Sequence, residues 1–140
     1  GPIVATRQLA NQSWPVKASE LRKAMNQLGG ELLVKTIPPW VNGEIKAQEQ
    51  DHSQATYSKK FTKIDGLLDL TDDPYKNFLK IKAFDDSIGT HFFVEENNKK
   101  IRVLVKDAKF VDGKLTITHV LPEGKWEMSL NEFQKNLTKK

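Results

Sequence analysis

The segment from Ile101 to Leu121 places the tightest limit on how this chain can fold, because apolar and polar residues alternate along it on both sides of one turn. A period of two is the pattern of a β-strand with one buried face. Asp112-Gly113 has the composition of a tight hairpin turn. The alternation changes parity at Asp107, which predicts a bulge or bend. We therefore expect an antiparallel, β-rich unit in the C-terminal half.

The residues on either side supply the remaining elements of this unit. Asp72-Asp73-Pro74 offers an aspartate N-cap and a proline for the first helical position, which predicts a helix start. Thr90–Val94 is a further strand candidate, followed by a turn at residues 96–98. Ser129 with Glu132 three residues later forms the pattern of a capping box before a short final helix. The order of elements predicts an α+β fold.

The first 45 residues have a different pattern. Residues 3–9 alternate well enough for a short strand. Apolar residues then recur at helical spacing from Leu21 to Leu32, and we expect Gly29-Gly30 to break this helix and Pro38-Pro39 to stop it. A strand needs sheet neighbours to satisfy its backbone groups. We expect residues 1–45 to be the tail of a Rossmann-like α/β domain whose sheet lies elsewhere.

The segment Asp51–Leu70 shows neither helical nor strand periodicity in its first half, so it reads as an ordered crossing between the two parts. These patterns predict three regions. They are the end of one domain at residues 1–45, a linker at residues 46–73, and a small β-rich domain at residues 74–140.

Composition excludes several functional classes. The chain has no cysteine, which excludes disulfides and thiolate chemistry, and its three histidines lack metal-ligand spacing. It has no membrane-length apolar run and no signal-peptide pattern. It also lacks a Gly-rich phosphate loop and a nucleophile elbow. We expect a soluble protein with no catalytic residue and no metal site within this sequence.

Two groups of basic residues are candidates for contact with a polyanion. The first is Lys59, Lys60 and Lys63 beside Thr56 and Tyr57, where ammonium groups could neutralise phosphates and the hydroxyls could set register. The second is Arg102, Lys106 and Lys109, which the strand pattern places on the solvent side of the β-rich unit. The formal net charge of +4 is too small to argue for nucleic acid unaided. A solvated surface stays open as the alternative for both groups.

Two stretches together resemble the methionyl-tRNA formyltransferase family. QDHSQATYSKKFTKIDGLLDL, residues Gln50–Leu70, is similar to the family's linker pattern with Ala-Thr-Tyr and two lysines. DGKLTITHVLPEGKWEMSLNEF, residues Asp112–Phe133, is similar to its C-terminal pattern of an apolar strand, Pro-x-Gly-Lys-x-x-Met, a serine and a short helix. Leu28–Leu33 also matches the last helices of the catalytic domain in order and spacing.

This resemblance implies a function. The whole enzyme transfers a formyl group from 10-formyltetrahydrofolate to the amino group of methionine on initiator tRNA. Its catalytic asparagine, histidine and aspartate belong to an Asp-x-Gly-Pro-containing domain, and Gly1-Pro2-Ile3 resembles the end of that motif. We expect the catalytic residues to lie before residue 1, so that this chain would be a fragment unable to transfer a formyl group alone.

The resemblance also implies that the linker and an OB-like C-terminal domain hold initiator methionyl-tRNA. The implied tRNA-binding residues are Thr56, Tyr57, Lys59, Lys60, Lys63, Arg102, Lys106, Lys109 and Lys125. The family's domain carries one more hairpin than the spacing here allows, so we expect an abbreviated barrel. A monomeric, cytoplasmic protein of bacterial type is implied. Two alternatives are a nucleotide-sugar N-formyltransferase and a non-enzymatic RNA-binding module.

Overall fold

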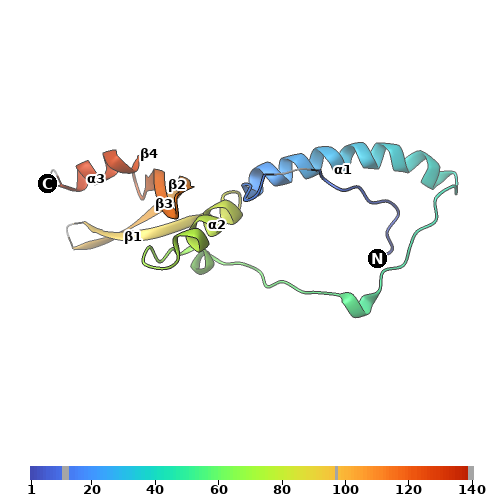
Figure 1. Cartoon of the computed structure of the whole chain (residues 1–140), viewed down its shortest axis with the longest axis horizontal. Helices are drawn as coiled ribbons and strands as arrows, with labels where there is room; N and C mark the ends of the chain where they lie inside the picture. Colours follow the sequence, from blue (N-terminus) through green and yellow to red (C-terminus); the bar gives the residue numbers. More distant parts are fainter. Residues whose placement is uncertain (11–12, 97, 139–140) are drawn as a thin grey trace. The chain divides into compact units, whose positions relative to one another are not determined.

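The computed structural model describes residues 1–10, 13–96 and 98–138. The chain forms two compact units, residues 1–60 and residues 61–140. Helices and an antiparallel sheet are both present (Figure 1), which confirms the α+β class. None of the helices in the described ranges is long and apolar enough to cross a membrane.

The first unit is built on helix α1, Ala18–Val41. It is 24 residues long, and Figure 1 shows it as one unbroken helix. None of its residues is buried, and large apolar side chains such as Leu33, Ile37 and Val41 stay exposed. The helix therefore keeps several large apolar side chains exposed, although residues 3–5 line a pocket together with Leu32 and Leu33.

The predicted break at Gly29-Gly30 and the predicted stop at Pro38-Pro39 are both wrong, because α1 runs through them to Val41. Each glycine costs a helix about 1 kcal/mol relative to alanine, and the surrounding helix-forming residues tolerate that cost. The prolines lie in the last turn, where their carbonyls accept from the Asn42 and Glu44 amides at 3.0 and 2.9 Å. Only two carbonyls upstream lose their donors, so the helix ends one turn later than predicted.

The predicted strand at residues 3–9 is also wrong. In the described ranges Ile3 makes a single antiparallel bridge with Gln48, through two backbone hydrogen bonds of 2.8 Å. Alternation alone cannot make a strand where no neighbouring strand accepts its backbone groups. After α1 and this bridge, a short 3₁₀ helix, η1 (His52–Gln54), precedes an extended segment.

The second unit is organised by a four-stranded antiparallel sheet in the order β1-β2-β3-β4. The strands are β1 (Thr90–Glu96), β2 (Lys99–Val111), β3 (Lys114–Pro122) and β4 (Met128–Ser129). The turn predicted at residues 96–98 includes residue 97, which lies outside the described residues. Asp112 and Gly113 both adopt positive φ between β2 and β3, which confirms the predicted hairpin turn.

The bulge predicted at Asp107 is confirmed. The pairing of β2 with β3 shifts register between Val105 and Asp107 and again between Asp107 and Ala108. Val105 and Ala108 are three residues apart, yet both are buried in the core. The extra residue keeps the apolar side of the long β2 strand directed at the core along its whole length.

Two helices pack on the core side of the sheet. Helix α2 (Pro74–Phe84) contributes Phe78 and Ile81, and helix α3 (Leu130–Thr138) contributes Phe133. The predicted start of α2 is confirmed, because the Asp73 carboxylate accepts from the backbone amides of Tyr75 and Lys76. Ser129 Oγ accepts from the Glu132 amide at 3.2 Å, which confirms the serine cap of α3.

The residues before α2 pair with the start of β1 at its outer edge. Lys63–Gly66 forms the 3₁₀ helix η2, and Leu67 then makes a parallel bridge with His91. The Leu68 amide donates to the His91 carbonyl at 2.8 Å, and Leu68 itself is buried in the core. This part of the predicted linker therefore packs within the β-rich unit.

Candidate nucleic-acid interface

The first candidate group lies on either side of the boundary between the two units. Thr56, Tyr57, Lys59 and Lys60 belong to the extended segment at the end of residues 1–60, and all four are exposed. The Tyr57 ring has 95% of its surface accessible. Lys63 is exposed in the first turn of η2, within residues 61–140. We call these five residues the linker group.

The Lys63 end of the linker group is held in place by local hydrogen bonds. The Asp65 carboxylate accepts from the Thr62 amide at 2.8 Å and from the Thr62 hydroxyl at 3.0 Å. These bonds close the single turn of η2, so the backbone that carries Lys63 has a defined direction. The arrangement allows Lys63 to reach solvent without disturbing the core.

The second candidate group lies on the solvent side of the sheet, as the strand pattern predicts. Val103 and Val105 face the core and are buried. At the alternate positions, Arg102 is half-buried and Lys106 is exposed. Lys109 is exposed beyond the bulge, where Ala108 takes over the core position. We call Arg102, Lys106 and Lys109 the sheet cations. They lie along one strand, which suits contact with a run of phosphates.

Lys125 differs from the sheet cations. Its Nζ lies 3.4 Å from a Glu96 carboxylate oxygen and 5.8 Å from the centroid of the Phe133 ring. Its side chain is mostly covered, at 32% relative exposure. An ammonium that already faces a carboxylate and an aromatic ring is less available to a phosphate than one in solvent. The structure thus gives Lys125 a packing role that its sequence context did not indicate.

Two residues on the solvent side of the sheet were missed by the sequence analysis. Phe93 on β1 lies directly opposite Arg102 on β2, and Lys100 Nζ lies 4.5 Å from the centroid of the Phe93 ring. Phe93 remains 40% exposed. The signal was present, because Phe93 and Phe92 alternate in a strand and only one of them can face the core. The predicted strand Thr90–Val94 carried no assignment of its residues to the two faces.

His91 lies beside this ring and is buried. Its imidazole makes an edge-to-face contact with Phe93, with centroids 5.4 Å apart. Burial lowers the pKa of His91 below its usual value, and the positive charges of Arg102 and Lys80 lower it further. The histidine is therefore neutral near pH 7, and its ring packs against Phe93.

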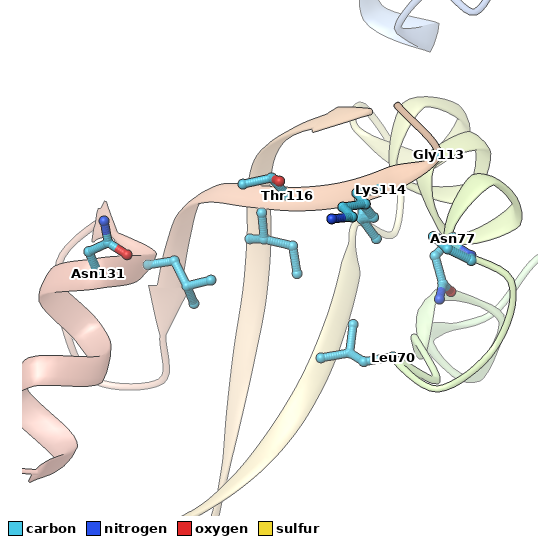
Figure 2. Close-up of a pocket in the computed structure, with 10 residues that line it drawn as sticks. Leu70, Asn77, Gly113, Lys114, Thr116 and Asn131 are labelled. Carbon is cyan, nitrogen blue, oxygen red and sulfur yellow. The ribbon is translucent and has the colours of Figure 1, made fainter. Parts of the chain in front are cut away.

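A pocket of about 550 Å³ lies between the start of α2, the β2–β3 hairpin and the start of α3. Figure 2 shows Asn77 and Lys114 at its hairpin end and Asn131 on α3. Asn77 is buried and donates to the Asp69 carbonyl, so its amide is already used in holding the chain before α2. The lining contains no acid–base pair, and the described residues hold no cluster of three potential metal ligands.

Comparison with known proteins bears on the resemblance. No protein-family model matches the sequence. Methionyl-tRNA formyltransferase of Herpetosiphon aurantiacus is 29% identical over 96% of this chain and 50% of its own length. The enzyme of Streptococcus pyogenes serotype M4 is 30% identical over 81% of this chain and 42% of its own length. The chain is related to the methionyl-tRNA formyltransferases.

A third relative, the methionyl-tRNA formyltransferase of Kosmotoga olearia, is 44% identical over 49% of this chain and 22% of its own length. The resemblance inferred from the linker and C-terminal patterns is thus confirmed. The chain spans half or less of the length of these relatives.

Proposed function

We propose that this chain is the part of a methionyl-tRNA formyltransferase that binds initiator methionyl-tRNA. The observation that carries the proposal is the row of sheet cations on the solvent side of a folded β-unit, in a chain related to enzymes of that name. Phosphate contacts of this kind supply affinity and orientation without reading sequence. The linker group would add further contacts before the β-unit.

In this proposal the three regions correspond to three parts of a methionyl-tRNA formyltransferase. Residues 1–45 would be the end of a Rossmann-like catalytic domain, residues 46–73 the linker, and residues 74–140 an abbreviated OB-like domain. The exposed apolar face of α1 supports the first assignment, because such a face is ordinarily covered by a domain core. The four-stranded order supports a shortened barrel. A cytoplasmic location would follow from the substrate.

The whole enzyme would transfer a formyl group from 10-formyltetrahydrofolate to the methionine amino group. The described residues do not fit a site for this donor. The pocket of about 510 Å³ next to η1 is lined partly by Glu49 and Asp51, which would repel the carboxylates of a folate. The pocket of about 370 Å³ beside α1 is lined by Ile3, Val4, Ala5, Gly29, Leu32, Leu33 and Thr36, without a charged group. We therefore assign no catalytic step to this chain.

Two other functions are weighed against the proposal. A nucleotide-sugar N-formyltransferase would not require the linker lysines or the Pro122-Glu123-Gly124-Lys125 turn. A free-standing RNA-binding module would require residues 1–60 to be stable alone, and α1 has no buried residue within them. Both observations favour the formyltransferase.

The experiment is binding of fluorescently labelled initiator tRNA across a salt series. The test variant changes Lys59, Lys60 and Lys63 to alanine, and the control changes the exposed Lys23, Lys35 and Lys114 instead. Both variants lose the same charge. We expect the test variant alone to flatten the dependence of log affinity on log salt, by about two to three units if all three lysines contact phosphates. Equal slopes in the two variants would contradict the role of the linker group.

A further inference from the structure

The solvent side of the sheet carries an aromatic ring flanked by cations. Phe93 is paired across the strands with Arg102, and Lys100 lies over its ring. We define Phe93, Lys100 and Arg102 as the Phe93 platform. The hydrophobic core does not require this ring, because the alternating Phe92 and Val94 face the core from β1 and Phe93 does not.

We propose that the Phe93 platform stacks an unpaired nucleobase of the bound RNA, with the adjoining phosphate held by Arg102 and Lys100. This inference rests on the proposed function and adds a second mode of contact to it. The sheet cations and the linker group would bind the backbone at any position. The Phe93 platform would instead select a place where the RNA is single-stranded, since only an unstacked base can lie on a side chain.

The contact between Lys100 and Phe93 can give way to a bound base. A cation–π contact at an exposed site is weaker than the stacking of a base on an aromatic ring. A base can therefore displace the lysine, and the released ammonium remains close enough to neutralise the phosphate of the same nucleotide. Arg102 is paired with Phe93 across the two strands, so its side chain starts from the same face of the sheet as the ring.

The charges around the Phe93 platform favour an anion, although acidic groups are present. Lys80 and Arg102 are close enough to His91 to lower its pKa. Glu95 lies opposite Lys100 on the paired strand, and Glu123 lines the small pocket that begins at Arg102. This pocket has a volume of about 240 Å³ and includes Leu104 and Leu121. Its charged lining is Arg102, Lys125 and Glu123, so the apolar part suits a base or ribose and the cations suit the adjoining phosphate.

The test compares two labelled RNAs at one salt concentration. One is a hairpin with a four-nucleotide single-stranded 3′ extension, and the other is the same hairpin with a blunt end. We expect the wild-type chain to bind the extended RNA about 5- to 150-fold more tightly, the range that stacking of one base supplies. Phe93→Leu should remove most of this ratio and leave the affinity for the blunt hairpin unchanged.

Two further variants keep the result interpretable. Phe93→Trp preserves an aromatic face and should restore the ratio. Val111→Ala removes another exposed side chain from β2 and should keep it. An unchanged ratio in Phe93→Leu, or equal binding of the two RNAs by wild type, would overturn the Phe93 platform while salt-dependent binding of the blunt hairpin still supports the proposed function. Absence of binding to either RNA would overturn both.

Discussion

The backbone of Gly66 packs directly against the carbonyl of Gly89, so that a side chain at Gly66 would collide with that oxygen. Gly66 ends η2, and Gly89 precedes β1 with a φ of +66°. The contact brings Leu67 and Leu68 to the edge of β1, where Leu68 enters the core. This pair of glycines joins the end of the linker to the sheet.

Gly66→Ala is therefore expected to destabilise residues 61–140. The added methyl group meets backbone, which cannot rotate away as a side chain can, and overpacking of this kind costs about 1–3 kcal/mol. Urea unfolding followed by circular dichroism would measure the change. Gly30→Ala adds the same methyl group where nothing lies within 4 Å, and should stabilise α1. Equal stability of Gly66→Ala and wild type would contradict the packing described.

Asp73 caps helix α2, and its removal tests how far the β-unit depends on that helix. Asp73→Ala loses two hydrogen bonds, from the Tyr75 and Lys76 amides, and should lower the free energy of unfolding by about 1 kcal/mol. The matched control is Asp72→Ala, which removes the neighbouring carboxylate, its solvent-exposed pair with Lys76 and its exposed hydrogen bond from the Asp73 amide, but leaves the two cap hydrogen bonds to α2. The control should change stability less, because exposed ion pairs contribute little.

Cap and turn signals predicted most of residues 61–140 because they act locally. Each of these signals fixes the backbone through its own hydrogen bonds or φ values and does not depend on tertiary contacts, as at Asp73, Asp112-Gly113 and Ser129. The errors fall in residues 1–60. Gly29-Gly30 and Pro38-Pro39 are helix breakers by propensity, yet α1 continues through both pairs. The cost of each glycine is small, and the prolines lie in the last turn, where few backbone hydrogen bonds are lost.

The candidate site was predictable only in part. Alternation placed Arg102 on the solvent side correctly, because parity is a property of the strand itself. The ion pair of Lys125 could not be predicted from alternation, since its partner Glu96 is distant in sequence and contacts it only when the sheet forms. Phe93 required knowledge of which of two adjacent phenylalanines faces the core. Such facts belong to the tertiary structure.

His91 predicts how stability depends on pH. Because its pKa is lowered in the folded state, the unfolded chain takes up a proton first as the pH falls below about 6.5. The free energy of unfolding should therefore fall by up to about 1.4 kcal/mol per pH unit between pH 6.5 and the lowered pKa, with no such loss above pH 6.5. Urea titrations at pH 7.5, 6.5, 5.5 and 4.8 would measure it.

His91→Leu should remove that pH-dependent loss, whereas His119→Leu, at an exposed position, should keep it. Arg102→Gln should raise the pKa of His91, because the guanidinium is one of the charges that oppose protonation. NMR titration of the imidazole protons would report the shift. A pKa of His91 at or above 6.5 in the folded wild-type protein would contradict the burial described.

Lys125→Met is expected to affect stability more than RNA affinity. The variant loses the 3.4 Å contact with Glu96, whose side chain has only 10% exposure, and should cost up to about 1 kcal/mol. Lys106→Met removes the same charge from an exposed position and should do the reverse. Thermal unfolding and tRNA binding measured on both variants would separate the roles. Similar losses of tRNA affinity in both would show that Lys125 also contacts RNA.

The most direct test of the account is to locate initiator tRNA on the chain by ultraviolet cross-linking and mass spectrometry of the linked peptides. Aromatic residues that stack on bases should cross-link, so the account predicts adducts at Tyr57 and Phe93 that decline as salt is raised. The exposed Trp14 and Trp126 serve as internal controls and should carry few adducts. Adducts confined to residues 18–41, or an unchanged pattern at high salt, would contradict tRNA binding by the linker group and the sheet.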